Sequence, residues 1–253
     1  MENNNQNNYI KVSGIVVSEP TPSHEVYGEE FYNFNIECTR LSDVKDTLPV
    51  TISSRLFDPS DIKVGNYIEI NAQIRSYNYY SEGKTHLILT IFVKDLCKKA
   101  DLSENDKNDV KLNGYICKPP VYRTTPFGRE IADVLLAVNR AYNKSDYIPI
   151  ICWGRNARFV SKLEVGSNIA VSGRMQSRIY HKKIDEENVV EKTAYEVSIS
   201  KIEHIVNEWM IFNTSSRVLA PNLDLWSKYI PFQICVHSHG ALISGGNWTP
   251  TEI

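Results

Sequence analysis

The chain has 253 residues, 42% of them hydrophobic, and a formal net charge of −2, which suits two small domains with a packed core in each. Its five cysteines, an odd number without a C-x-x-C pair, argue against a secreted disulfide framework and for a reducing cytoplasm. The first residues lack the basic start and apolar stretch of a signal peptide, and no apolar run in the sequence reaches the ~18 residues that cross a bilayer.

In chain order, the Asn-rich residues 1–8 predict a disordered arm. The segment 9–96 then predicts β-strands, with a short helix or turn near 55–61. The strands are expected at 9–17, 30–40, 48–53, 66–77 and 85–94. Residues 97–108 are polar and charged, and we expect them to form a linker.

The segment 109–206 predicts the same order of elements. Its strands are expected at 111–117, 131–139, 147–153, 168–180 and 193–202. Residues 156–163 are its one helical stretch, because Phe159, Val160 and Leu163 lie on one helical face. Gly173 predicts a bend in the fourth strand.

Residues 207–253 fit neither segment and receive no assignment. The cluster Cys235-Val-His-Ser-His239 lacks a fourth ligand at the usual zinc spacing, so we expect no metal site. Ile230-Pro231-Phe232 is interpreted as a coincidental tripeptide, because no acidic run precedes it and 21 residues follow it. The sequence has no phosphate loop and no nucleophile motif, so we expect no enzyme and no cofactor.

The two strand-rich segments align with each other at a spacing of one hundred residues. The identical pairs in this alignment include Lys11/Lys111, Gly14/Gly114, Pro20/Pro120, Gly28/Gly128, Glu30/Glu130, Arg40/Arg140, Pro49/Pro149 and Arg55/Arg155. One inserted residue later, Ser76 matches Ser177. A period of this length is the size of a whole small domain. The chain therefore contains a duplicated domain.

Five strands, with one short helix between the third and the fourth, are the order of the OB-fold. The predicted class is thus all-β, with two tandem OB-fold five-stranded Greek-key barrels, one short helix in each, and an unassigned C-terminal segment. Open sheets and sandwiches remain alternatives at this point.

Five motifs of the second segment together resemble the bacterial single-stranded DNA-binding protein family. They are Gly114-Tyr-Ile-Cys-Lys-Pro-Pro, Tyr122-Arg-Thr-Thr-Pro-Phe-Gly-Arg129, Val134-Leu-Leu-Ala-Val-Asn-Arg-Ala-Tyr142, Tyr147-Ile-Pro-Ile-Ile-Cys-Trp-Gly154 and Gly173-Arg-Met-Gln-Ser-Arg-Ile-Tyr180. The first segment resembles the family weakly. The resemblance implies non-enzymatic binding of single-stranded DNA in replication, repair or recombination, in the bacterial cytosol or nucleoid. It also implies a homo-oligomer, a dimer of two-barrel chains.

The resemblance implies that aromatic side chains of the second barrel stack on unpaired bases: Tyr142, Tyr147, Trp153 and Tyr180. Cationic neighbours would hold the phosphates: Arg123, Arg129, Arg140, Arg174, Arg178, Lys182 and Lys183. In the strand 147–153, Ile148, Ile150 and Cys152 alternate with the aromatic positions, which favours an exposed aromatic row. Aromatic residues are also common in strand cores, which is the alternative interpretation.

The first barrel lacks most of these groups. Ser42, Thr47 and Ser53 replace three aromatics, and Ser23 and Glu29 replace Arg123 and Arg129. The remaining candidates there are Tyr77, Tyr79 and Tyr80. We expect this barrel to serve assembly or a protein partner more than DNA.

The charge balance agrees with that division. Residues 109–206 hold 15 Lys and Arg against 11 Asp and Glu, a net of +4, whereas 9–100 hold 10 against 12, a net of −2. Two other functions stay open: a replication-restart assembly protein whose barrels bind proteins, and a single-stranded RNA binder, since stacking does not depend on the 2′-hydroxyl.

Overall fold

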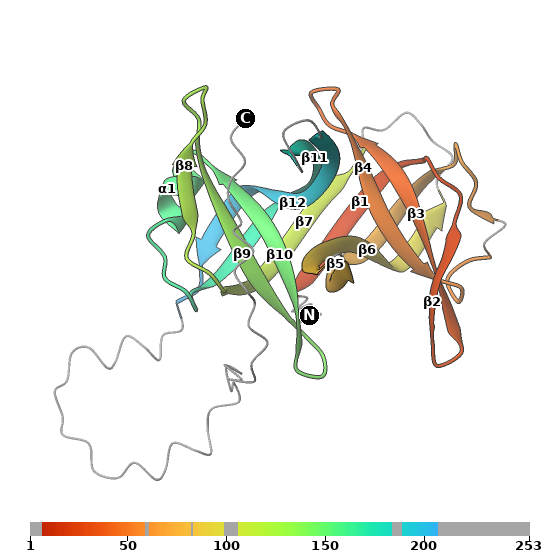
Figure 1. The fold of residues 1–253 in the computed structure, drawn as a ribbon. Coiled ribbons are helices and arrows are strands. Elements are labelled where there is room, and N and C mark those ends of the chain that lie inside the picture. The colour runs from red at the N-terminus through yellow and green to blue at the C-terminus, as the bar shows by residue number, and fades with distance from the viewer. Residues whose placement is uncertain (1–6, 59–60, 82, 99–105, 184–188, 207–253) are drawn as a thin grey trace, which may run out of the picture. The chain divides into compact units, whose positions relative to one another are not determined.

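The computed structural model describes residues 7–58, 61–81, 83–98, 106–183 and 189–206. These residues form twelve β-strands and one short α-helix (Figure 1), so the all-β prediction is confirmed. The C-terminal segment 207–253, with its Cys235–His239 cluster, lies outside the described residues, as do most of the predicted arm and linker.

The strands divide into two copies of one arrangement. The first copy contains β1 (Asn8–Val16), β2 (Thr21–Val26), β3 (Glu29–Thr39), β4 (Lys45–Ser53), β5 (Tyr67–Ser81) and β6 (Lys84–Lys98). The second copy contains β7 (Asn108–Ile116), β8 (Val121–Thr124), β9 (Glu130–Arg140), β10 (Lys144–Trp153), α1 (Arg155–Val160), β11 (Asn168–Lys183) and β12 (Val189–His204). All ten predicted strands are present. β2 and β8 were not predicted, because β2 is exposed along its whole length and β8 along most of it, so that neither has a buried face.

Each copy closes into a five-stranded barrel. Within the first copy the strands pair in the order β3-β4-β6-β5-β1, and β1 returns to β3 through Ile15 and Glu37. The second copy follows the same order with β9-β10-β12-β11-β7, and β7 returns to β9. The parallel pairings β4–β6 and β10–β12 make the path a Greek key. This is the predicted OB-fold.

Barrel closure explains one identity between the copies. At Gly114, a Cβ atom would lie 2.4 Å from the carbonyl oxygen of Ala137, and at Gly14 it would lie 2.3 Å from that of Glu37. Any side chain here would separate the first strand from the strand that it crosses, so only glycine fits.

The interior of each barrel is mainly aliphatic. In β10, Ile148, Ile150 and Cys152 are buried, whereas Tyr147 and Trp153 point to the opposite, outer side. This alternation is the one expected from the sequence. Burial raises the pKa of the Cys152 thiol to about 12, and the nearby carboxylate of Asp133 adds to the effect. The thiol is therefore a core group, and not a nucleophile.

The helix is shorter than predicted, and only the second copy has one in the described residues. α1 covers Arg155–Val160, where 156–163 was expected. In the first copy, residues 54–56 form a turn. The sequence accounts for this difference, because Pro59 lacks an amide hydrogen and disfavours the helical conformation of Asp58.

The two barrels share one continuous sheet. β1 and β7 pair antiparallel, with Ile10 opposite Val110 (Figure 1). The side-chain amide of Asn108 donates to the carbonyl of Met175 at 2.7 Å and accepts from its N–H at 2.9 Å. Asn8 makes the same pair of bonds with the backbone of Ile74. The repeat therefore encodes two barrels and also an approximate two-fold contact between them.

Two buried aspartates connect the copies, and we call them the acidic clasps. Asp46, in β4, accepts from the N–H of Ser177 at 2.7 Å and from two nitrogens of Arg40 at 2.6 Å each. Asp146, in β10, accepts from the N–H of Ser76 at 2.8 Å. Each clasp lies in one copy and holds the long fourth barrel strand of the other. The identities Arg40/Arg140 and Ser76/Ser177 thus belong to this junction.

Candidate functional site

The outer face of the second barrel is made by β11, β12, β10, β9 and β8 in that order. Side chains on this face follow from the strand registers. Arg174 lies opposite Ser198, Ile151 lies beside Ser198, and Asp133 lies opposite Ile151. Residues two apart along each strand therefore share this face with them.

Trp153 lies at the end of β10 on this face. Its indole N–H donates to the hydroxyl of Ser198 at 3.0 Å, and 37% of its surface is exposed. Gly154, with a φ of 51°, ends the strand directly after it. The hydrogen bond fixes the edge of the indole while part of the ring stays open to solvent.

A hollow of about 730 Å³ lies beside Trp153. Four arginines line it, and Asp109 is the one acidic residue in its lining. These arginines are Arg40, Arg129, Arg174 and Arg178. Trp153 and the hollow together give an aromatic surface surrounded by positive charge.

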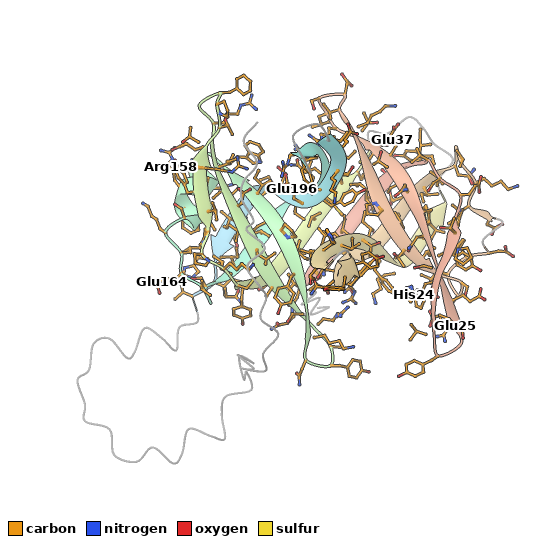
Figure 2. The ribbon with its side chains drawn as sticks, in the orientation of Figure 1. His24, Glu25, Glu37, Arg158, Glu164 and Glu196 are labelled. Atoms are coloured by element: carbon orange, nitrogen blue, oxygen red, sulfur yellow. The ribbon has the colours of Figure 1, made fainter. Side chains whose placement is uncertain are left out.

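The arginines differ in how far the protein neutralises them. Within the described residues, the side chains of Arg129 and Arg174 have no ion pair and no hydrogen bond. Arg178 lies 3.8 Å from Glu196, on β12 (Figure 2), and its guanidinium carbon lies 6.0 Å from the ring centre of half-buried Tyr180. The hollow thus brings Trp153 and three predicted arginines together, and Tyr180 lies next to one of these arginines, Arg178.

Two other predicted arginines form ion pairs with aspartates of the same chain. Arg123 pairs with Asp133 at 2.8 Å, and Arg140 lies 3.6 Å from the clasp residue Asp146. Their charges are matched by carboxylates. Lys182 and Lys183 fall in β11, but the positions of their side chains lie outside what the structure describes.

Tyr142 and Tyr147 lie away from Trp153. Tyr147 is on the same side of β10 but six residues earlier, about 20 Å along the strand; 45% of its surface is exposed, and its N–H donates to Ser76 of the first barrel. Tyr142 is 93% exposed in the turn before β10, with a positive φ. The four predicted aromatics therefore form an extended row, and not a single cluster.

The structure adds residues that the sequence did not single out. Ser198 orients Trp153, and Arg40 enters the hollow from the first barrel. Phe127 is 89% exposed in the β8–β9 turn, two residues before Arg129. The sequence analysis quoted Phe127 within a motif, between Pro126 and Gly128. These two turn-forming neighbours were the available signal that its side chain is exposed. Ser198 carried no such signal, because only strand pairing brings it to Trp153.

In the first barrel, the position of Trp153 is held by Ser53. Its hydroxyl donates to Glu29, and the guanidinium of Arg55 lies 3.3 Å from the same carboxylate. The acid that replaces Arg129 is therefore partly neutralised. Tyr77, Tyr79 and Tyr80 are exposed along β5.

One sequence correspondence is wrong. The spacing of one hundred equates Arg123 with Ser23, but Arg123 lies opposite Ile131, whereas His24 lies opposite the equivalent Phe31. A register shift between Pro22 and His24 causes the difference. His24, on β2 (Figure 2), is thus the structural counterpart of Arg123.

The described part of the chain contains no group of three side chains suited to hold a metal ion. Among the same residues, no helix has the length and apolar character to cross a membrane.

Comparisons with known proteins agree with this geometry. The model of the single-strand binding protein family matches residues 107–205. Single-stranded DNA-binding protein B of Bacillus subtilis is 36% identical over 80 residues, 29% of this chain and 71% of that protein. Single-stranded DNA-binding protein 1 of Staphylococcus aureus is 41% identical over 80 residues, 29% of this chain and 48% of that protein. The chain thus spans about half the length of the two Staphylococcus aureus relatives that it matches at 41% identity.

The crystal structure of wild-type single-stranded DNA binding protein from Thermus aquaticus matches with a TM-score of 0.63, covering 79% of this chain and 93% of that one. The two sequences are 17% identical, so this likeness bears on the fold alone. Because the match covers 79% of this chain, the similarity of fold includes both barrels and not the second barrel alone.

Proposed function

Because this chain belongs to the single-strand binding protein family, we propose that it binds single-stranded DNA, without chemical turnover, on the outer face of its second barrel. The main support is Trp153, oriented by Ser198 and placed beside Arg129 and Arg174. A base of any identity can stack on an aromatic ring, which contributes ~1–3 kcal/mol per base. Arginines without a carboxylate partner can bind the phosphates.

The single strand of DNA would run from the hollow beside Trp153, along β10, toward the first barrel. Tyr180 and Arg178 extend the stacking surface on one side of Trp153. Tyr147 and Tyr142 follow along and beyond β10, near the junction of the barrels. Such a path binds without reading sequence, since its contacts are ring faces and phosphates.

The biological setting that fits this activity is replication, repair or recombination in the bacterial cytosol. A dimer of two-barrel chains would offer four barrels to one strand. The mass of the protein in solution tests that assembly.

Two rival functions predict different ligands. A single-stranded RNA binder would hold oligo-U as tightly as oligo-dT. An assembly protein of the replication-restart kind is favoured by one observation, the replacement of Trp153 by Ser53 in the first barrel. Such a protein would bind oligo-dT weakly and without strong salt dependence.

The test is a fluorescence anisotropy titration of labelled oligo-dT with the full chain. We expect Trp153→Ala combined with Tyr180→Ala to weaken binding by roughly 2–5 kcal/mol, since two stacking surfaces are lost and their effects are partly non-additive. Phe159→Ala, an exposed aromatic of α1 outside the hollow, is the matched control. Normal binding by the double variant would show that the assigned face is wrong.

A further inference from the structure

The first barrel has an aromatic group on the face that corresponds to the proposed DNA site. Thr51 pairs with Phe92 as Ile151 pairs with Ser198. Phe92 therefore holds the position of Ser198, while Ser53 holds that of Trp153. In the second barrel the aromatic residue lies in β10 and the serine in β12. In the first barrel the serine lies in β4 and the aromatic residue in β6.

The exchange keeps an aromatic ring in the same part of the face. Phe31 lies directly across from Ser53, as Ile131 does from Trp153. Because serine is small, the rings of Phe31 and Phe92 approach each other across β4 to 5.8 Å between centres. They occupy the space above Ser53.

The aromatic group continues beyond these two rings, of which Phe31 is buried. The imidazole of His24 stacks on Phe31 at 4.7 Å with the planes 7° apart, and His24 is exposed (Figure 2). Phe92 is half-buried and keeps part of its ring accessible. We call His24, Phe31 and Phe92 the first-barrel aromatic ladder.

Cationic side chains flank the ladder. The guanidinium carbon of Arg75 and the ammonium of Lys94 each lie 5.7 Å from the centre of the Phe92 ring. Both residues also line a hollow of about 320 Å³, together with Arg140 of the second barrel, and no acidic side chain is in its lining. Arg75 is paired with Asp146, whereas Lys94 has no carboxylate partner in the described residues.

From this arrangement we infer that the outer face of the first barrel is a second site for single-stranded DNA. The first-barrel aromatic ladder, and Phe92 in particular, is its stacking surface. The inference rests on the proposed function of the second barrel, because the occupant is the same strand. Uncharged side chains of neighbouring strands also share this face: Thr51 bonds to Asn33 and to Thr90. The carboxylate of Glu29 beside Ser53 is paired with Arg55. A polar surface with aromatic rings, a paired acid and a lysine without a carboxylate partner in the described residues fits a nucleic acid strand better than it fits an acidic protein surface.

The test compares short and long oligo-dT on the full chain. One OB-fold covers ~4–16 nucleotides, so an oligomer of about 10 nucleotides occupies one barrel and one of about 30 reaches both. We expect Phe92→Leu and Lys94→Gln each to weaken binding of the long oligomer, and Phe92→Leu to do so about tenfold, with little change for the short one. Leucine keeps an apolar side chain at residue 92, and Lys63→Gln, an exposed lysine of the loop before β5, is the control for Lys94.

The outcomes separate the two sites. Wild-type binding of the long oligomer by both variants overturns the inference. Equal losses for both lengths also overturn it, since the residues would then act through the second barrel or through folding. Loss of short-oligomer binding in the Trp153 and Tyr180 variant reports on the proposed function alone.

Discussion

At the scale of single residues, the arginines of the second barrel divide by their partners and not by their closeness to aromatics in sequence. Arg123 is paired with Asp133, and Arg140 faces the clasp residue Asp146. Arg174 has no ion pair and no side-chain hydrogen bond in the described residues, and it lines the hollow beside Trp153. A phosphate replaces water around a free guanidinium, but it must compete with a carboxylate around a paired one. Free arginines should therefore account for most of the salt dependence of binding.

We expect Arg174→Gln to reduce the slope of log affinity against log salt by about 0.7, the contribution of one phosphate contact to a single strand. Lys162→Gln, which removes an exposed lysine beyond α1, should leave the slope unchanged. Titrations of oligo-dT at four or more salt concentrations measure both. An unchanged slope for Arg174→Gln would remove this residue from the proposed contact.

At the scale of elements, the acidic clasps connect strands of different barrels. Asp46 is fully buried and accepts hydrogen bonds from the backbone and hydroxyl of Ser177 as well as from Arg40. Both ions of this pair are largely shielded from water, so removing one leaves the other uncompensated. The start of β4 and the middle of β11 should therefore unfold together.

We expect Asp46→Asn to lower the free energy of unfolding by about 2–4 kcal/mol, because Arg40 loses its carboxylate while the shape of the side chain is kept. Asp43→Asn is the matched control: Asp43 is exposed in the adjacent turn with a φ of 61°, which asparagine tolerates. Urea unfolding followed by circular dichroism measures the difference. Equal stabilities of the two variants would show that the clasp contributes nothing.

At the scale of the whole molecule, an ion triad joins the copies near the β1–β7 pairing. Glu69 of β5 lies 2.9 Å from Lys11 and 3.0 Å from Lys107, at the start of the second copy. Hydrogen bonding to Lys11 lowers the pKa of Glu69 below its ordinary value of 4.5, against the opposing effect of burial. A carboxyl group whose folded pKa is lowered stabilises the fold above its unfolded pKa, and this contribution is lost as the pH falls through the folded pKa.

We expect Glu69→Gln to cost about 1–2 kcal/mol of stability near neutral pH, since the lysines are partly exposed and their pairs are screened. The difference from wild type should shrink as the pH falls below 4.5, where the wild-type carboxyl also becomes protonated. Thermal melts of both proteins between neutral and acid pH measure the gap. A gap that stays constant with pH would contradict an electrostatic role.

The sequence by itself determined the class of fold and the outward direction of Trp153. Alternating apolar residues predicted the core face of β10, because side-chain direction in a strand depends only on local geometry, and this placed Trp153 on the outside. The spacing of one hundred predicted two barrels. Glycine identities such as Gly14/Gly114 marked the backbone crossings that the fold cannot avoid.

Tertiary structure decided which residues meet. Strand register brought Ser198 to Trp153, and a register shift put His24 where the alignment had Ser23. The β9–β10 hairpin turned Arg140, a candidate phosphate ligand, toward the clasp at Asp146. Phe92 shows the same limit most clearly, because a ring lost from β4 and supplied from β6 is invisible in a linear comparison. Neighbours across a sheet are far apart in sequence, so their chemistry emerges only when the strands are paired.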